Sequence, residues 1–162
     1  MNKLLLITNE EFENYQPALK VISHECARKF ASLRISQKIK IALSWRSDLV
    51  VPVILEDSFS NVWVGVDQRV ASISRQGIIL FSMGLGSALL DIKQLSKIIV
   101  VLCETELFTI NQDFSIRRLH YLRDLPDSIA SKGDDLIVTF IDASDERIPL
   151  QFRCNVVMSK LE

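Results

Sequence analysis

The sequence lacks an apolar run long enough to cross a bilayer. Its longest such run, Leu49–Leu55, is seven residues long and includes Pro52, whereas a membrane-spanning helix needs about 20. The apolar stretch near the N-terminus, Leu4–Ile7, is shorter than the core of a secretion signal, and Glu10 and Glu11 follow it. We therefore expect a cytoplasmic protein that has no membrane partner and begins with a strand at Leu4–Ile7.

Cysteine and histidine are scarce, with three and two copies. Cys26, Cys103 and Cys154 are widely spaced and form no Cys-x-x-Cys pair, which excludes a disulfide framework and a zinc site of the usual spacing. Each cysteine lies among apolar residues, which favours a buried thiol. His24 and His120 are far apart in the sequence. We expect no metal and no cofactor.

Catalytic motifs are also missing. The segment Met83–Ser87 contains a Gly-x-Gly but neither the third glycine of a dinucleotide-binding loop nor the Lys-Ser/Thr of a phosphate loop, and it predicts a turn. His24 and Cys26 are close in sequence, whereas a catalytic base and its nucleophile usually come from separate elements. Glu104 and Glu106 fall on a predicted hairpin turn, where solvated carboxylates are poorly suited to acid–base catalysis. We therefore expect a protein that is not an enzyme.

Charge is nearly balanced overall, at −1, but is unevenly distributed. Residues 28–46 hold six basic residues and no acid. This segment also contains Phe30 and Trp45, a combination that occurs in RNA-binding surfaces, but the chain has no broad excess of positive charge. We therefore do not expect a nucleic-acid partner. A late segment concentrates five acids: Asp134, Asp135, Asp142, Asp145 and Glu146.

The N-terminal part, residues 1–37, shows helical spacing. Apolar residues recur at intervals of three and four between Pro17 and Leu33, which predicts an amphipathic helix. Pro17 suits the first turn of such a helix. An alternative places Cys26, Phe30 and Ile35 on strands.

Residues 38–162 have the character of a β-meander. Lys38–Trp45 alternates polar and apolar residues, as a half-buried strand does. Short runs rich in Val, Ile and Leu then follow at close intervals, which is typical of antiparallel strands joined by turns. The fold class expected is α+β, mostly antiparallel β, in a single domain of 162 residues. The predicted runs are 49–55, 62–66, 70–73, 78–81, 88–92, 98–103, 107–110, 116–119, 136–141 and 148–152.

Two segments of this meander are similar to each other. Val62–Ile73 and Ile99–Ile110, 37 residues apart, both consist of a strand, a polar turn that opens with an acid, and a second strand. Leu136–Ser144 repeats the first half. The rhythm resembles the blades of β-propeller proteins, in which units of about 40 residues each supply a four-stranded sheet. The alternatives are a sandwich that evolved by hairpin duplication, or hairpins that are merely regular.

Trp63 opens the first repeat and shares a strand face with Gly65. It either fills the space above that glycine or marks an exposed contact surface, and we expect burial.

Function is predicted by exclusion to be non-catalytic protein binding. In length, strand content and its acidic segment, the chain is similar to the immunity proteins of bacterial contact-dependent growth-inhibition systems. That resemblance implies a basic toxin domain as the partner, bound through Asp134, Asp135, Asp142, Asp145 and Glu146. Alternatives are a β-propeller-like scaffold or a ligand-binding module of another pathway, then an RNA-binding protein or a hydrolase.

Overall fold

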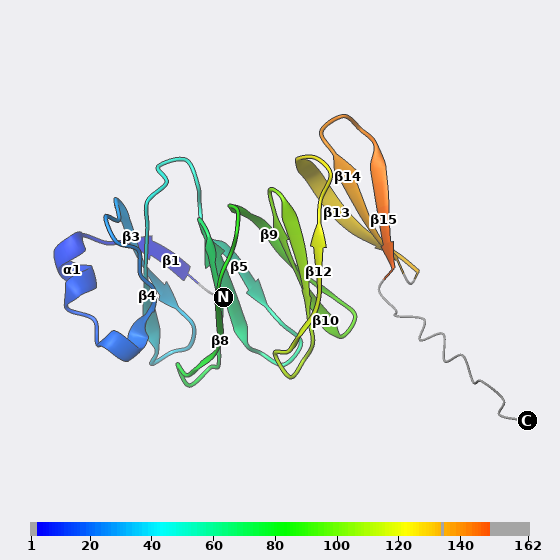
Figure 1. Cartoon of the computed structure of the whole chain (residues 1–162). Coiled ribbons are helices and arrows are strands. Elements are labelled where there is room, and N and C mark those ends of the chain that lie inside the picture. The colour runs from blue at the N-terminus through cyan, green and yellow to red at the C-terminus, as the bar shows by residue number, and fades with distance from the viewer. Residues whose placement is uncertain (1–2, 134, 150–162) are drawn as a thin grey trace, which may run out of the picture. The chain divides into compact units, whose positions relative to one another are not determined.

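The chain folds mostly into antiparallel β-sheet. The computed structural model describes residues 3–133 and 135–149, which fall into two compact units, Met1–Arg123 and Asp124–Glu162. Unit 1 contains three four-stranded sheets, and the described part of unit 2 forms a three-stranded sheet (Figure 1). Neither helical segment in the described residues has the length and hydropathy to cross a bilayer.

Sheet A has the strand order β1-β3-β4-β2, with β2 parallel to β4 and the other pairs antiparallel. A short helix, α1 (Asn9–Glu13), precedes β2. Thr8 and Glu11 form a capping box at its start, in which each side chain accepts from the other residue's backbone N–H. The strands are β1 (Lys3–Leu6), β2 (Lys20–Ile22), β3 (Lys29–Arg34) and β4 (Lys40–Trp45).

Sheets B and C are antiparallel meanders of consecutive strands. Sheet B consists of β5 (Val53–Glu56), β6 (Val62–Val66), β7 (Arg69–Ile73) and β8 (Ile79–Gly84). Sheet C consists of β9 (Leu89–Leu95), β10 (Ile98–Cys103), β11 (Glu106–Ile110) and β12 (Ile116–Tyr121). In unit 2, sheet D consists of β13 (Pro126–Lys132), β14 (Asp135–Phe140) and β15 (Asp145–Pro149).

The sequence repeat corresponds to a structural repeat. The hairpin β6–β7 is followed 37 residues later by the hairpin β10–β11, and β14–β15 repeats the pattern in unit 2. The predicted strand runs lie on β5 to β15 with shifts at their ends. Of the last predicted run, residues 150–152 lie outside the described residues.

Four turns in the described residues share one geometry, at 57–61, 74–78, 111–115 and 140–144. In each turn, the backbone N–H of the first residue donates to the carbonyl oxygen of the fifth. The N–H of the fourth residue donates to the carbonyl oxygen of the first, and all these distances are 2.9–3.0 Å. The fourth residue has a positive φ in every case, although only Gly77 is a glycine. This is a type I turn followed by a left-handed residue, a common hairpin connection.

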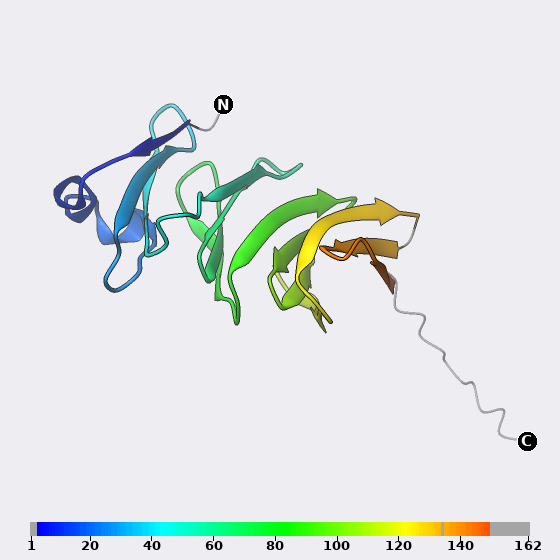
Figure 2. The same cartoon turned by 90° about the horizontal axis from the view of Figure 1, so that it is seen from above.

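The core of unit 1 depends on burial of both faces of sheet B. Val62, Val64 and Val66 of β6 face the apolar side of sheet A, whereas Trp63 packs with residues of sheet C. Sheet B therefore lies between sheets A and C, as the view from above shows (Figure 2). Two-sided burial explains why β6 is apolar throughout instead of alternating with polar residues.

The predicted helix at Pro17–Leu33 is wrong. Residues 17–19 form a single 3-10 turn, and β2 and β3 follow. Cys26 has φ 56°, a left-handed conformation that an α-helix cannot contain. Phe30 lies half-buried on β3 against the ring of Phe12 from α1, at 5.4 Å between centroids. The helical spacing arose because β3 has covered side chains on both faces.

Trp63 is buried, as expected, with 1% of its surface exposed. Its indole N–H donates to the carboxylate of Asp57 at 3.1 Å, and its ring packs against Phe81 and Phe114. Asp57 also accepts from the backbone N–H groups of Phe59 and Asn61, so the tryptophan is tied to the turn before its own strand.

Sheets B and C pack closely at Gly65. A Cβ at this position would lie 2.7 Å from Leu89 Cδ1 and 3.2 Å from the carbonyl oxygen of Arg69. We expect Gly65→Val to lower the free energy of unfolding by about 1–3 kcal/mol through overpacking. Gly84→Val is the matched control, because Gly84 has no atom within 4 Å of its Cβ position. Equal stability of the two variants in urea titrations would contradict this packing.

Candidate functional site

The connections between the sheets of unit 1 gather at one end of the strands. In a four-stranded meander, the turn after the second strand and the linker after the fourth lie at the same end. The linker after β8 is held there by backbone hydrogen bonds, from Leu85 to Gln68 at 2.8 Å and from Glu104 to Ala88 at 3.0 Å. We call this surface the linker end. Its residues are 23–28, 46–52, 67–69, 85–88 and 104–105.

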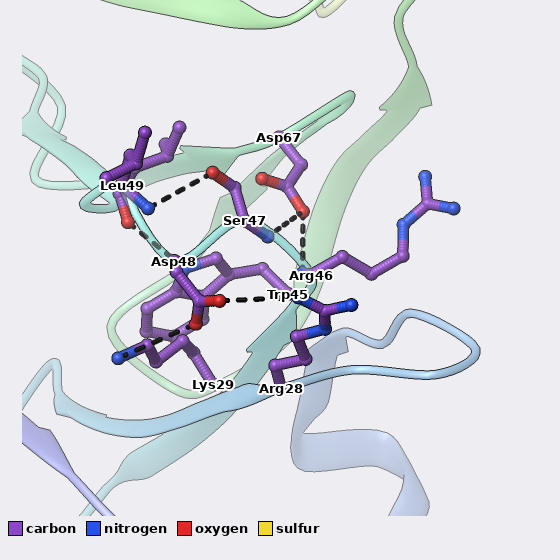
Figure 3. A network of polar contacts seen from close by, with 9 residues as sticks. Arg28, Lys29, Trp45, Arg46, Ser47, Asp48, Leu49 and Asp67 are labelled. Atoms are coloured by element: carbon purple, nitrogen blue, oxygen red, sulfur yellow. Dashed lines mark hydrogen bonds and ion pairs between the residues drawn. The ribbon is translucent and has the colours of Figure 1, made fainter.

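Asp67 hydrogen-bonds to the linker from sheet A and to the start of sheet C, and Figure 3 shows the first of these contacts. It is buried in the β6–β7 turn with φ 50°. Its Oδ2 accepts from the backbone N–H of Arg46 at 2.7 Å and, at 3.4 Å, from that of Ser47, both in the linker from sheet A. Its carbonyl oxygen accepts from Leu89 N–H, at the start of sheet C, at 2.7 Å. One residue therefore fixes the backbone of three successive sheets.

Glu106 plays a related part at the next junction. The side chain is buried, and Oε1 accepts from the backbone N–H groups of Gly86 and Ser87 at 2.6 and 3.3 Å. A Cβ on Gly86 would lie 3.0 Å from both carboxylate oxygens. The expectation that Glu106 is solvated was therefore wrong, whereas Glu104 is exposed. Met83 and Gly84 end β8, and residues 85–88 connect it to β9, so the predicted turn begins two residues later than expected.

Two open depressions lie at the linker end. One, of about 550 Å³, is lined by Ser23, His24, Glu25, Arg46 and Arg69. The second, of about 630 Å³, is also lined by Arg46, so the two adjoin. Its other lining residues include Cys26, Arg28, Asp67, Gln68 and Glu104.

The arginines at these depressions differ in their partners. Arg28 lies 3.4 Å from Asp48, which Lys29 also approaches at 3.8 Å (Figure 3). The guanidinium groups of Arg46 and Arg69 make no ion pair within residues 3–133 and 135–149. Both side chains are exposed. Two cations therefore line one depression without a protein partner in the described chain.

His24 lines the same depression as these two arginines. Its backbone N–H donates to Ser44 Oγ at 3.1 Å, but its ring Nε2 is buried and has no hydrogen-bond partner in the described residues. Burial lowers the pKa of His24, and the positive charges of Arg69 and Arg46 lower it further, against the opposing effect of Asp67. The ring is therefore neutral at neutral pH.

The predicted acidic surface lies in unit 2, apart from Asp134, which is outside the described residues. Asp135 begins β14 opposite Pro149, whereas Asp145 pairs with Thr139 at the other end of that strand. The acids therefore occupy opposite ends of β14, as expected. Asp145 accepts from Thr139 Oγ1 at 2.8 Å, and Asp142 accepts from the backbone N–H of Ser144 at 2.9 Å.

These bonds give Asp142 and Asp145 a local role in the β14–β15 hairpin. Glu146 is half-buried on β15, opposite Val138. Partner binding by the acids stays a prediction.

The basic residues of 28–46 do not form one face. Because β3 and β4 are antiparallel, Lys29 lies opposite Trp45, whereas Arg34 lies opposite Lys40 at the other end of sheet A. Only Arg28, Lys29 and Arg46 belong to or adjoin the linker end. In the described chain, no three His, Cys, Asp or Glu side chains gather where they could hold a metal ion.

Comparisons with known proteins give structural likenesses only. No protein-family model matches the chain, and no curated protein matches it in sequence. A protein of unknown function from Bacteroides caccae is 13% identical, with a TM-score of 0.45 over 68% of this chain and 48% of its own.

Two lyase structures are also similar. A catalytically inactive virginiamycin B lyase from Staphylococcus aureus, solved with quinupristin, is 12% identical, with a TM-score of 0.46 over 94% of this chain and 61% of its own. A streptogramin B lyase is 10% identical, with a TM-score of 0.43 over 94% and 60%. The chain thus spans about half to three-fifths of the length of these structures.

The Asp67 junction makes a stability prediction. We expect Asp67→Gly to lower the free energy of unfolding by about 1–3 kcal/mol, because glycine tolerates φ 50° but leaves the N–H groups of Arg46 and Ser47 without their acceptor. Asp67→Asn keeps an acceptor and a residue type suited to positive φ, so its loss should be smaller. Equal losses in chemical denaturation would show that the hydrogen bonds are not the cause.

The cysteines differ in expected reactivity. Cys26 is exposed, contrary to expectation, whereas Cys103 is buried and Cys154 is outside the described residues. Burial, reinforced by Glu106 and Glu104, raises the pKa of Cys103 to about 12, so it stays a thiol at neutral pH. In a Cys154→Ser background, a thiol reagent at about pH 8 should modify Cys26 in the native protein and Cys103 only after unfolding. Mass spectrometry of the labelled peptides checks this, and rapid native labelling of Cys103 would contradict it.

Proposed function

We propose that the protein is a non-catalytic binding module and that its linker end contacts a partner protein. The observation that carries the proposal is the pair of exposed arginines, Arg46 and Arg69, which line an open depression without an ion-pair partner in the described chain. Loops positioned by a rigid β-scaffold are frequent binding surfaces, and arginine is enriched at protein interfaces.

Binding fits this end of unit 1 better than catalysis does. A nucleophilic mechanism needs a base within hydrogen-bond reach of the nucleophile. Cys26 and His24 line different depressions, and the buried Nε2 of His24 has no hydrogen-bond partner in the described residues. The depressions are open surfaces, which suit a contact with another macromolecule more than the enclosure of a small substrate.

The proposal includes a propeller-like arrangement of the sheets. Its support is the 37-residue repeat and the four-stranded meanders B and C, whose linkers and second turns meet at one end as in successive blades. In its narrowest form, the proposal makes the chain a cytoplasmic immunity protein with a toxin domain as its partner. Length and strand content support that form, in which the acidic segment of unit 2 is the competing candidate for the contact surface.

The test compares two surfaces in one capture experiment. Tagged wild-type protein, an Arg46→Glu/Arg69→Glu variant and an Asp142→Lys/Asp145→Lys/Glu146→Lys variant are used to capture partners from lysate of the source organism. The product of the adjacent gene is included as a purified candidate. Circular dichroism and thermal unfolding establish that each variant is folded. The partner is then purified and its affinity for each variant is measured by calorimetry.

We expect the arginine variant to lose the partner by about tenfold or more in affinity, and the acidic variant to keep it. Loss in the acidic variant alone would move the binding surface to unit 2, as the sequence predicted. Retention of the partner by both variants would overturn the linker end as the contact surface.

A further inference from the structure

We infer that Arg46, Arg69 and His24 form a binding site for a doubly charged oxyanion, the phosphate group of a phosphorylated partner residue. The inference rests on the proposed function, because it names the group that the linker end binds. The three side chains come from the linker after β4, the start of β7 and the β2–β3 loop, and all three line the depression of about 550 Å³.

The charges favour a dianion. Arg46 and Arg69 bring two guanidinium groups from sheets A and B, and a guanidinium binds phosphate through paired N–H donors. A phosphate monoester carries about −1.5 to −2 charges at neutral pH, which matches two cations, whereas a carboxylate carries one. Glu25 is the acid among the lining residues, and it is exposed.

Asp67 is the second acid near this site, and its carboxylate is hydrogen-bonded to the backbone. Its Oδ2 accepts from two backbone N–H groups, one of which belongs to Arg46 itself. Asp67 is therefore a positioning residue that holds the backbone of Arg46 at the rim of the depression. Its negative charge also faces His24 and offsets part of the repulsion from the two arginines.

His24 supplies the second, independent observation. Nε2 of the ring is buried without a hydrogen-bond partner in the described residues, and native proteins rarely keep such an atom without a reason. In the free protein, burial together with Arg69 and Arg46 opposes protonation of the ring. A bound dianion would offset the arginine charges and favour the protonated ring, so binding should take up a proton. Affinity for the dianion should therefore rise as the pH falls through the titration range of His24.

Sulfate is the first probe, because it stays a dianion at the pH values used. Titrations of ¹⁵N-labelled protein with sulfate, inorganic phosphate and acetate are followed by NMR at about pH 8 and about pH 5.5. We expect sulfate and phosphate to shift the amides of residues 24, 46–47 and 67–69, with acetate at least about tenfold weaker. Sulfate should bind more tightly at the lower pH. It should also raise the pKa of His24, as read from its ring resonances.

Variants separate a built site from general attraction of anions. Arg46→Gln and Arg69→Gln should each weaken sulfate binding by about tenfold, the effect of losing a charged hydrogen bond. His24→Gln should abolish the difference in sulfate affinity between about pH 5.5 and about pH 8. Arg34→Gln is the matched control, because Arg34 is an exposed arginine at the opposite end of sheet A. It should leave the affinity within about twofold.

The outcomes also separate this inference from the proposed function. Shifts spread over many basic residues, an equal effect of Arg34→Gln, or acetate binding as tightly as sulfate would overturn the dianion site. If sulfate fails to bind but the Arg46→Glu/Arg69→Glu variant still loses its partner protein, the binding surface stands and the phosphate class falls. If sulfate binds as expected and that variant keeps its partner, the oxyanion site stands and the proposed contact surface falls.

Discussion

Buried carboxylates accept hydrogen bonds from backbone N–H groups in the linkers, and these bonds connect the successive sheets of unit 1. Each sheet is small, and the linkers that join them carry N–H groups that no strand pairs. Asp67 satisfies two of them, in Arg46 and Ser47, while its own carbonyl accepts from Leu89. Because the same contact sets the backbone of Arg46, the fold and the candidate site depend on one side chain.

The parts of the fold that the sequence predicted are those that local spacing determines. Strands and turns recur every 37 residues because each sheet is a meander of neighbouring segments, so the repeat is visible without long-range information. Burial of Trp63 was also expected from local sequence, because it shares a face with Gly65, although Leu89 and Ile92 of sheet C lie above that glycine. The acids of unit 2 likewise occupy the two ends of β14 that their spacing indicated.

The predictions were wrong where contacts with distant segments determine the structure. Apolar spacing of three and four between Pro17 and Leu33 indicated a helix, but strands covered on both faces place apolar residues at any spacing. Glu106 looked solvated because its partners, at Gly86 and Ser87, come from the preceding linker. The candidate site itself joins three elements that are remote in sequence. No sequence motif indicates it, because its residues come together only when sheets A and B pack against each other.

In both repeats a carboxylate accepts from the N–H groups of the preceding linker, but it comes from different residues. This difference explains where the site lies. In sheet B the carboxylate comes from the turn, at Asp67, which leaves the first residue of β7 free to be Arg69. In sheet C the equivalent first residue, 37 positions later, is Glu106, and it supplies the carboxylate itself. The equivalent of Asp67 there is Glu104, which is exposed. The same structural position thus carries an exposed cation at one junction and a buried anion at the next. A cationic depression can therefore form between sheets A and B but is not repeated between sheets B and C, although the backbone pattern is.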